Sequence, residues 1–210
     1  MELPFTASQF LEVFRHYNTA DFPVQFLFIL LALMVVVFAV KHHLNSGRAI
    51  SAILGLLWLW MGMIYHWGFF AEINKAAFGF GAAFVAQGAL FLVKGVLHDK
   101  LKFSHKPTPA VWAGSAMMLY ALLIYPLLGY TLGHGYPDSP TFGLPCPTTI
   151  FTLGILLWLD KKPPMYLLVI PLLWSLIGTV AAVRLGMRED VGLLVSGALT
   201  AWFLVRNKPL

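Results

Sequence analysis

The sequence predicts an all-α fold: a polytopic membrane helical bundle of about seven transmembrane helices with a short N-terminal interfacial helix. The chain of 210 residues is 59% hydrophobic and only 11% charged, whereas soluble domains carry about 25% charged residues. Most of its length divides into stretches that approach the ~20 apolar residues needed to cross a ~30 Å hydrocarbon core. We therefore expect one compact helical domain in lipid and no separate soluble domain.

The first 22 residues read as an amphipathic segment on the membrane surface. Thr6 and Gln9 have the spacing of a capping box, which starts a helix. Phe10, Phe14 and Tyr17 then recur at helical spacing and form one apolar face. A frayed tail with a few aromatic residues is the alternative. Because the first residues are acidic, we expect no cleavable signal.

Residues 23–210 are expected to form the transmembrane domain. The apolar stretches and their breaks place the seven spans to within a few residues. The expected spans are Pro23–Val40, Ala49–Phe70, Ala77–Leu97, Val111–Gly133, Leu144–Leu159, Pro164–Leu185 and Val191–Val205.

The basic residues orient these spans. Cytoplasmic loops are enriched in Lys and Arg, and an external N-terminus places ten of the 14 Lys and Arg residues on the cytoplasmic side. The sequence therefore predicts an N-terminus outside and a C-terminus in the cytoplasm. Arg184, Glu189 and Asp190 then fall in an outer turn, where we expect an exposed charge pair that contributes little stability.

A single cysteine, Cys146, stands between Pro145 and Pro147 where the fifth span begins. Proline lacks an N–H and is tolerated in the first helical turn, so Cys146 is expected at a helix N-terminus. The 16 residues of this span reach about 24 Å, which is short of the hydrocarbon core. Either the bilayer thins locally or the preceding Gly- and Pro-rich loop dips into the bundle, and we expect this loop to form a lid or plug. A buried thiol that only fills space is the alternative.

Other polar residues gather on the same predicted outer side. His66, near the outer end of the second span, is interpreted as a ligand, a proton relay or a hydrogen-bonded strut. Glu72 and Asn74 are interpreted as binding residues or as caps of the third helix. Gln87 is interpreted as a residue that forms a hydrogen bond between helices, or as a polar residue along a conduction path. Tyr65, Trp67, Phe69 and Phe70 are expected to form an interfacial aromatic belt.

We expect the binding site to combine these outer polar residues. The candidate binding residues are Cys146, His66, Glu72, Asn74, His134, Tyr136, Asp138, Thr148 and Gln87. Cys146 and His66 are also the candidate metal ligands and the candidate catalytic pair, and no catalytic residue is assigned. We find no haem, flavin or nucleotide motif, so a metal ion is the one cofactor considered.

Three segments resemble a family of uncharacterised bacterial multi-pass membrane proteins, catalogued as a domain of unknown function. They are Met1–Thr6, His66–Asn74 and Phe142–Thr152. The resemblance implies the fold and a bacterial inner (cytoplasmic) membrane location, and it implies no chemistry. The Cys-Pro pair is also similar to the motif of heavy-metal pumping ATPases, but the nucleotide-binding and phosphorylation motifs of those pumps are missing from this sequence.

Three functions remain open at this point. The first is a binding or transport protein with an outward-facing pocket for a small solute or soft metal ion. The second is a structural or accessory subunit of a larger membrane complex. The third is a membrane enzyme, such as an acyltransferase, in which Cys146 is the nucleophile, His66 or His134 the base, and the amides of Thr148 and Thr149 an oxyanion hole. Expected partners are the lipid bilayer, a small solute or ion, and a second copy or a complex subunit, but not nucleic acid.

Overall fold

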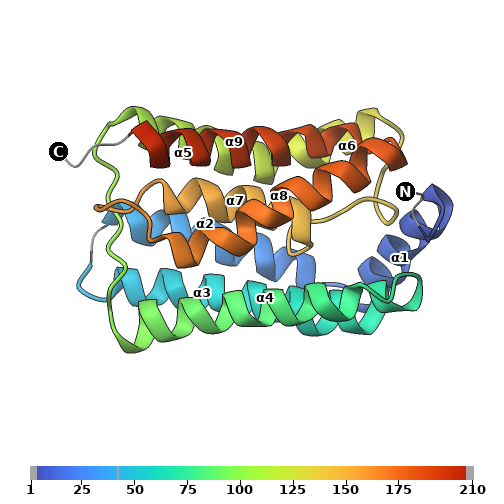
Figure 1. Cartoon of the computed structure of the whole chain (residues 1–210), viewed down its shortest axis with the longest axis horizontal. Coiled ribbons are helices and arrows are strands. Elements are labelled where there is room, and N and C mark those ends of the chain that lie inside the picture. The colour runs from blue at the N-terminus through green and yellow to red at the C-terminus, as the bar shows by residue number, and fades with distance from the viewer. Residues whose placement is uncertain (1–3, 42, 207–210) are drawn as a thin grey trace.

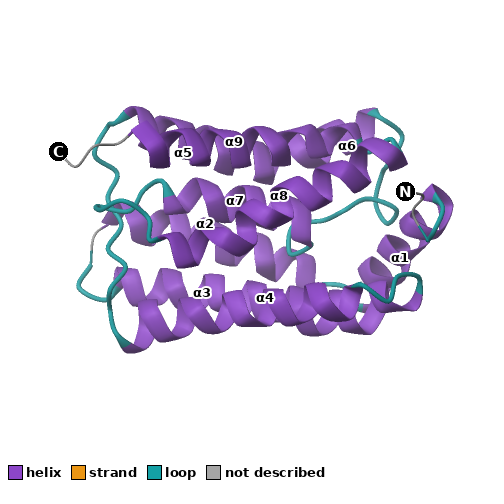
Figure 2. Cartoon of the chain, in the orientation of Figure 1, coloured by secondary structure: helices purple, strands orange, loops and turns teal. Residues whose placement is uncertain are grey.

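The computed structural model describes residues 4–41 and 43–206, in which helices are joined by turns and loops (Figure 2). Lys208, one of the ten Lys and Arg residues that the sequence places on the cytoplasmic side, lies outside the described residues, as does Glu2. The helical segments are α1 Ala7–Ala20, α2 Val24–Lys41, α3 Ser46–Trp60, η1 Met61–Phe69, η2 Phe70–Glu72, α4 Ala77–Phe91, η3 Leu92–Leu97, α5 Pro109–Leu119, η4 Tyr120–Ile124, α6 Tyr125–Thr131, α7 Pro145–Leu156, α8 Met165–Leu185, η5 Arg188–Asp190 and α9 Val191–Arg206.

The long helices run along one common direction, and α1 lies across one end of the bundle (Figure 1). Helix α3 contacts both α2 and α4, and α8 contacts α4 on one side and α9 on the other. Helix α7 lies in the interior, where it contacts α5, α8 and α9. We call the end that carries α1 the α1 end and the other the opposite end.

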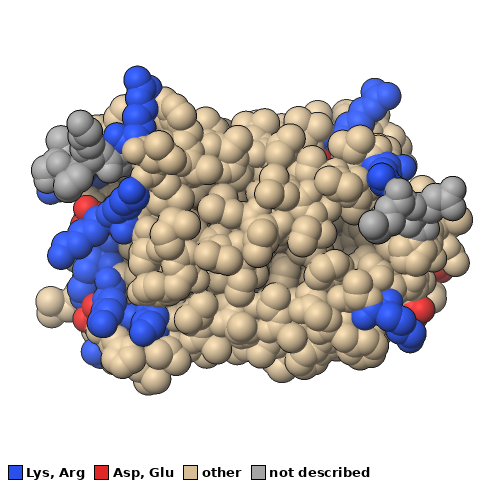
Figure 3. All heavy atoms as spheres, in the orientation of Figure 1, with Lys and Arg blue, Asp and Glu red and all other residues tan. Residues whose placement is uncertain are grey.

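Five helices are long and apolar enough to cross a membrane: Val24–Lys41, Ser46–Glu72, Ala77–Leu97, Pro109–Thr131 and Met165–Leu185. Each agrees with an expected span to within a few residues, and α4 with η3 covers the expected Ala77–Leu97. Helix α7 is apolar but shorter, and α9 runs beside the others for 16 residues (Figure 1). Figure 3 shows Lys and Arg gathered mainly at the opposite end, with a band free of charged residues across the middle of this face.

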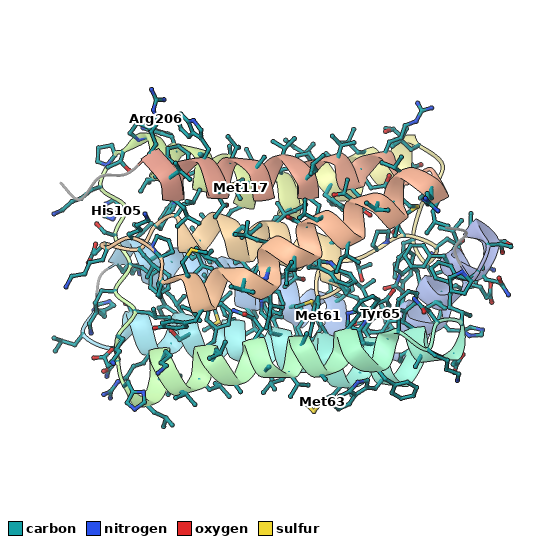
Figure 4. The ribbon with its side chains drawn as sticks, in the orientation of Figure 1. Met61, Met63, Tyr65, His105, Met117 and Arg206 are labelled. Carbon is teal, nitrogen blue, oxygen red and sulfur yellow. The ribbon has the colours of Figure 1, made fainter. Side chains whose placement is uncertain are left out.

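The α1 helix has the expected capping box, but its apolar face packs on protein. The amide of Gln9 donates to Oγ1 of Thr6 at 3.3 Å. Phe14 and Tyr17 are buried against the end of the second span, where Trp60 donates to the Tyr17 hydroxyl at 2.9 Å. Tyr65, labelled in Figure 4, stacks on this face. The segment is therefore docked on the bundle.

The predicted aromatic belt is wrong for two of its four members. Tyr65 and Phe70 are buried, at 3% and 6% exposure, because they pack against α1. Trp67 is exposed, and its indole N–H donates to the carbonyl of Phe78 at 3.0 Å. Aromatic residues at a span end are typical of the interface, but here α1 covers part of that surface.

Helix α7 begins inside the bundle, in agreement with the loop that the short predicted span led us to expect there. The chain enters from the α1 end as a loop and becomes helical only near the middle of the bundle (Figure 1). All residues from Pro147 to Leu156 are buried. The entering backbone is hydrogen-bonded, because Gly143 N donates to Thr148 Oγ1 at 3.0 Å and Leu144 N donates to Thr141 O at 3.0 Å. Irregular backbone is tolerated at this depth when protein satisfies it in this way.

Two glycines allow α5 and α7 to pack with their backbones in contact. A β-carbon added at Gly154 would lie 2.7 Å from the carbonyl oxygen of Gly114. Because a real β-carbon does not approach an oxygen so closely, any larger residue must push the two helices apart. Small residues at such crossings are typical of packed membrane helices.

We predict that Gly154→Ala lowers the free energy of unfolding by about 1–3 kcal/mol, the usual cost of overpacking a tight core. The matched control is Gly79→Ala in α4, where a β-carbon meets nothing within 4 Å among the described residues. That change should be neutral or stabilise by about 1 kcal/mol. Thermal unfolding of the purified protein in detergent measures both, and equal effects would contradict the close crossing.

Candidate functional site

A pocket of about 380 Å³ lies at the α1 end, between α1, η1, α4, α8 and the start of α7. Its volume falls in the range of small-molecule sites. The walls are mainly aromatic and aliphatic. They include Phe5, Phe10, Phe14, Tyr65, Phe70, Phe80, Leu144, Trp174, Leu176, Ile177 and Val180. The pocket exists because α7 stops short of this end and α1 closes over the space.

The polar groups of the pocket gather where α7 begins. Cys146 and Asp190 both line it, and their side chains interact with each other. The Tyr125 hydroxyl donates to Asp190 Oδ1 at 2.6 Å from the other side. Trp174, which also lines the pocket, reaches the sulfur of Cys146. The structure thus confirms Cys146 at a helix start and gives it an acidic neighbour that the sequence analysis did not assign to the site.

Asp190 and Glu189 overturn the expectation of an exposed charge pair in the outer turn. Asp190 is 3% exposed and Glu189 is fully buried. The turn that holds them follows Gly186, whose left-handed φ of 78° ends α8. The chain then doubles back so that both carboxylates face the bundle, while Arg184 and Arg188 stay exposed. A turn with the sequence Arg-Glu-Asp is usually exposed to solvent. Here residues of α6 and η4 contact the turn and bury it.

Burial raises the pKa of Asp190, which lies in the turn before α9, to about 7. Removal from water penalises its charged form, and the neighbouring Glu189 raises the pKa further. The hydrogen bonds from Tyr125 and Cys146 act in the opposite direction. Near neutral pH this carboxyl group therefore exists in both protonation states.

Glu189 points away from the pocket, toward His134. Its Oε1 lies 3.4 Å from Nδ1 of His134, and within the described part of the chain neither carboxylate oxygen has a hydrogen-bond partner. The carbonyl of Glu189 accepts a hydrogen bond from the Tyr120 hydroxyl at 2.6 Å. His134, a predicted site residue, is therefore near an acid but is not part of the pocket wall.

His66 occupies an aromatic cage in the π-helical segment η1. It is fully buried, and its ring lies 4.6 Å from that of Phe84 and 5.2 Å from that of Trp174. Among the residues described, neither ring nitrogen has a hydrogen-bond partner. The interpretation as a hydrogen-bonded strut is therefore wrong, and no hydrogen bond joins His66 to Cys146. Segments of π-helix are frequent at functional sites, and this one places His66 directly behind the pocket wall.

The loop residues predicted for the site hold α1 in place. The Tyr136 hydroxyl donates to the carbonyl of Asn18 at 3.1 Å, and Asp138 accepts two hydrogen bonds from Arg15 at 2.7 and 2.9 Å. The buried Asn18 amide donates to the carbonyls of Pro137 and Ser139. The expected lid is therefore this loop together with α1.

The remaining predicted residues have structural roles or lie apart. Thr148 is buried, and its amide donates to Leu144 O at 3.2 Å, so it is not free to hold an oxyanion. Gln87 donates to Leu167 O of α8 at 3.0 Å, which confirms its interpretation as a link between helices. Asn74 lines the pocket and its Oδ1 accepts from Ala76 N.

Glu72 is exposed in η2, outside α4, so it does not cap that helix. Residues 4–41 and 43–206 contain no group of three or more His, Cys, Asp and Glu side chains able to hold a metal ion. Trp174 contacts both of the metal ligands predicted from sequence, the ring of His66 and the sulfur of Cys146.

The fold and the pocket define a helical bundle with candidate membrane helices and a largely apolar binding cavity at one end. The chain belongs to DUF6064, a family of unknown function, whose profile matches residues 7–209. Searches of curated proteins and of solved structures returned no match. The match confirms that the chain belongs to an uncharacterised family, and it assigns no chemistry.

We predict that Tyr125→Phe lowers the free energy of unfolding by about 1–3 kcal/mol, because Asp190 loses its buried donor. The control is Tyr130→Phe in the same helix, where the ring is 75% exposed and the effect should stay within about 0.5 kcal/mol. Thermal unfolding in detergent compares the two variants. Equal stability of both would show that the hydroxyl of Tyr125 does not stabilise the buried carboxyl group.

Proposed function

We propose that this protein is an integral membrane protein of seven spans that binds a small solute in the pocket at its α1 end and transports it. The five long apolar helices support a membrane bundle, and α7 and α9 add the sixth and seventh spans. Lys and Arg are concentrated at the opposite end (Figure 3), so the positive-inside rule directs the α1 end outward. The resemblance to bacterial proteins favours the inner membrane of a bacterium.

The pocket is the observation that carries this proposal. It combines a volume of about 380 Å³ with mainly apolar walls and a few polar groups at one end, which is the usual composition of a small-molecule site. The buried carboxyl of Asp190 strengthens it, because ionisable groups inside membrane proteins are costly and are typical of substrate pathways.

The other interpretations receive less support. A soft metal ion would need ligands in addition to Cys146, and the described residues supply no such cluster. The Cys–His enzyme would need a hydrogen bond between Cys146 and a histidine, but His66 has no hydrogen-bond partner in the described ranges. The subunit hypothesis rests on exposed apolar faces such as that of α2, and lipid covers such faces equally well.

The sole cysteine of the chain provides a direct test. In membrane vesicles, N-ethylmaleimide should label Cys146 of the native protein, because Cys146 lines the pocket. Ala181→Phe, which places a ring in the pocket, should slow labelling by about tenfold. Val183→Phe is the matched control, because Val183 lies on the same helix, is 72% exposed and does not line the pocket.

Labelling is measured by mass spectrometry of the intact protein. A native protein whose cysteine reacts only after unfolding would contradict the proposed pocket.

A further inference from the structure

The pocket is bounded on one side by an exposed face of α8. Leu176, Ile177 and Val180 line it, yet they are 56%, 43% and 58% exposed. Helix α8 is one of the five helices apolar enough to cross a membrane, so this side of the bundle faces hydrocarbon. A molecule that enters between these side chains comes from the lipid layer, and its apolar part stays in contact with lipid-facing residues.

Beside Cys146 the pocket offers Asp190 as an acceptor and the indole N–H of Trp174 as a donor. Asp190 is the acceptor, and its Oδ1 already receives the Tyr125 hydroxyl. The indole N–H of Trp174 is the donor: the residue is 8% exposed, and in the described part of the chain this nitrogen has no hydrogen-bond partner. The side chains of Asp190 and Trp174 both lie near the sulfur of Cys146, and among the described residues the indole N–H makes no hydrogen bond. A single small head group beside Cys146 can therefore meet both.

The lining restricts the charge of that head group. The described residues that line the pocket include no Lys, Arg or His, while Asp190 is adjacent to the buried Glu189. An anionic head would therefore meet like charge without compensation. An ammonium head can donate to Asp190 but cannot accept from Trp174, which leaves a buried donor unpaired. A hydroxyl group donates and accepts, and so satisfies both partners.

We propose that the pocket binds a single-chain amphiphile with a hydroxyl head, which enters from the outer leaflet through the face of α8. The hydroxyl lies between Asp190 and Trp174 beside Cys146, and the chain runs along Leu176, Ile177 and Val180 toward the lipid. This inference rests on the proposed function, because it assigns a ligand class to the same pocket.

The test uses the full-length protein in nanodiscs of phosphatidylcholine and three dodecyl probes that carry a photoactivatable diazirine in the chain. The probes differ only in the head group, which is an alcohol, an amine or a carboxylate. We expect the alcohol to crosslink to the α8 segment 176–182 at least about tenfold more than the carboxylate, and more than the amine. Peptide mass spectrometry locates and quantifies the adducts.

Two pairs of variants separate specific binding from general partition into lipid. Ala181→Phe should reduce crosslinking of the alcohol by about tenfold, whereas the lipid-facing Val183→Phe should match wild type. Trp174→Phe removes the indole donor and should reduce crosslinking of the alcohol about tenfold. Trp112→Phe, which changes a ring that is 69% exposed in α5, should leave crosslinking unchanged. Gel filtration and thermal unfolding confirm that each variant is folded.

Equal crosslinking of alcohol and carboxylate, a preference for the amine, or equal behaviour within either pair of variants would overturn the inference. These outcomes differ from failure of the proposed function. If Cys146 is labelled in the native protein but the alcohol does not bind, the pocket stands and only the ligand class is wrong. If Cys146 is unreachable in the native protein, the pocket itself is wrong.

Discussion

The structure depends on one constraint, which is that α7 begins inside the bundle. Pro145 and Pro147 fix its start, and the backbone before it is satisfied by the protein through the bond from Gly143 to Thr148. Because α7 occupies only part of the bundle's length, other groups must fill the α1 end. The aromatic face of α1, the loop that precedes α7 and the carboxyl of Asp190 take up this space. What they leave open is the pocket.

Two acidic side chains, Glu189 and Asp190, are buried at the α1 end. A buried carboxylate without full pairing costs several kcal/mol, yet the chain retains two in adjacent positions. Asp190 is directed to the pocket by Tyr125, while Glu189 has only a distant contact with His134. In the proposed function, Asp190 is the group that meets the polar part of a ligand in this largely apolar cavity.

Composition and hydrophobic periodicity predicted the helices, because these depend on short stretches of sequence. The proline rule likewise predicted where α7 starts. The burial of Asp190 was missed, since its partner Tyr125 is 65 residues away in sequence and no local pattern links the two. His66 was found in a ring of aromatic side chains from several helices, where a polar partner was expected. Contacts between distant segments determine the surroundings of such residues, and these contacts cannot be inferred from a single sequence.

Hydrogen–deuterium exchange across the entrance to α7 tests the central constraint most directly. If this irregular backbone is packed and hydrogen-bonded, the amides of Gly143 and Leu144 should exchange within about tenfold of the amide of Phe151 in the core of α7. Amides of the exposed loop at Lys161 provide the fast reference. Exchange at Gly143 and Leu144 as fast as at Lys161 would show that the backbone before α7 is exposed to solvent. That result would contradict the packed start of α7 and the pocket beside it.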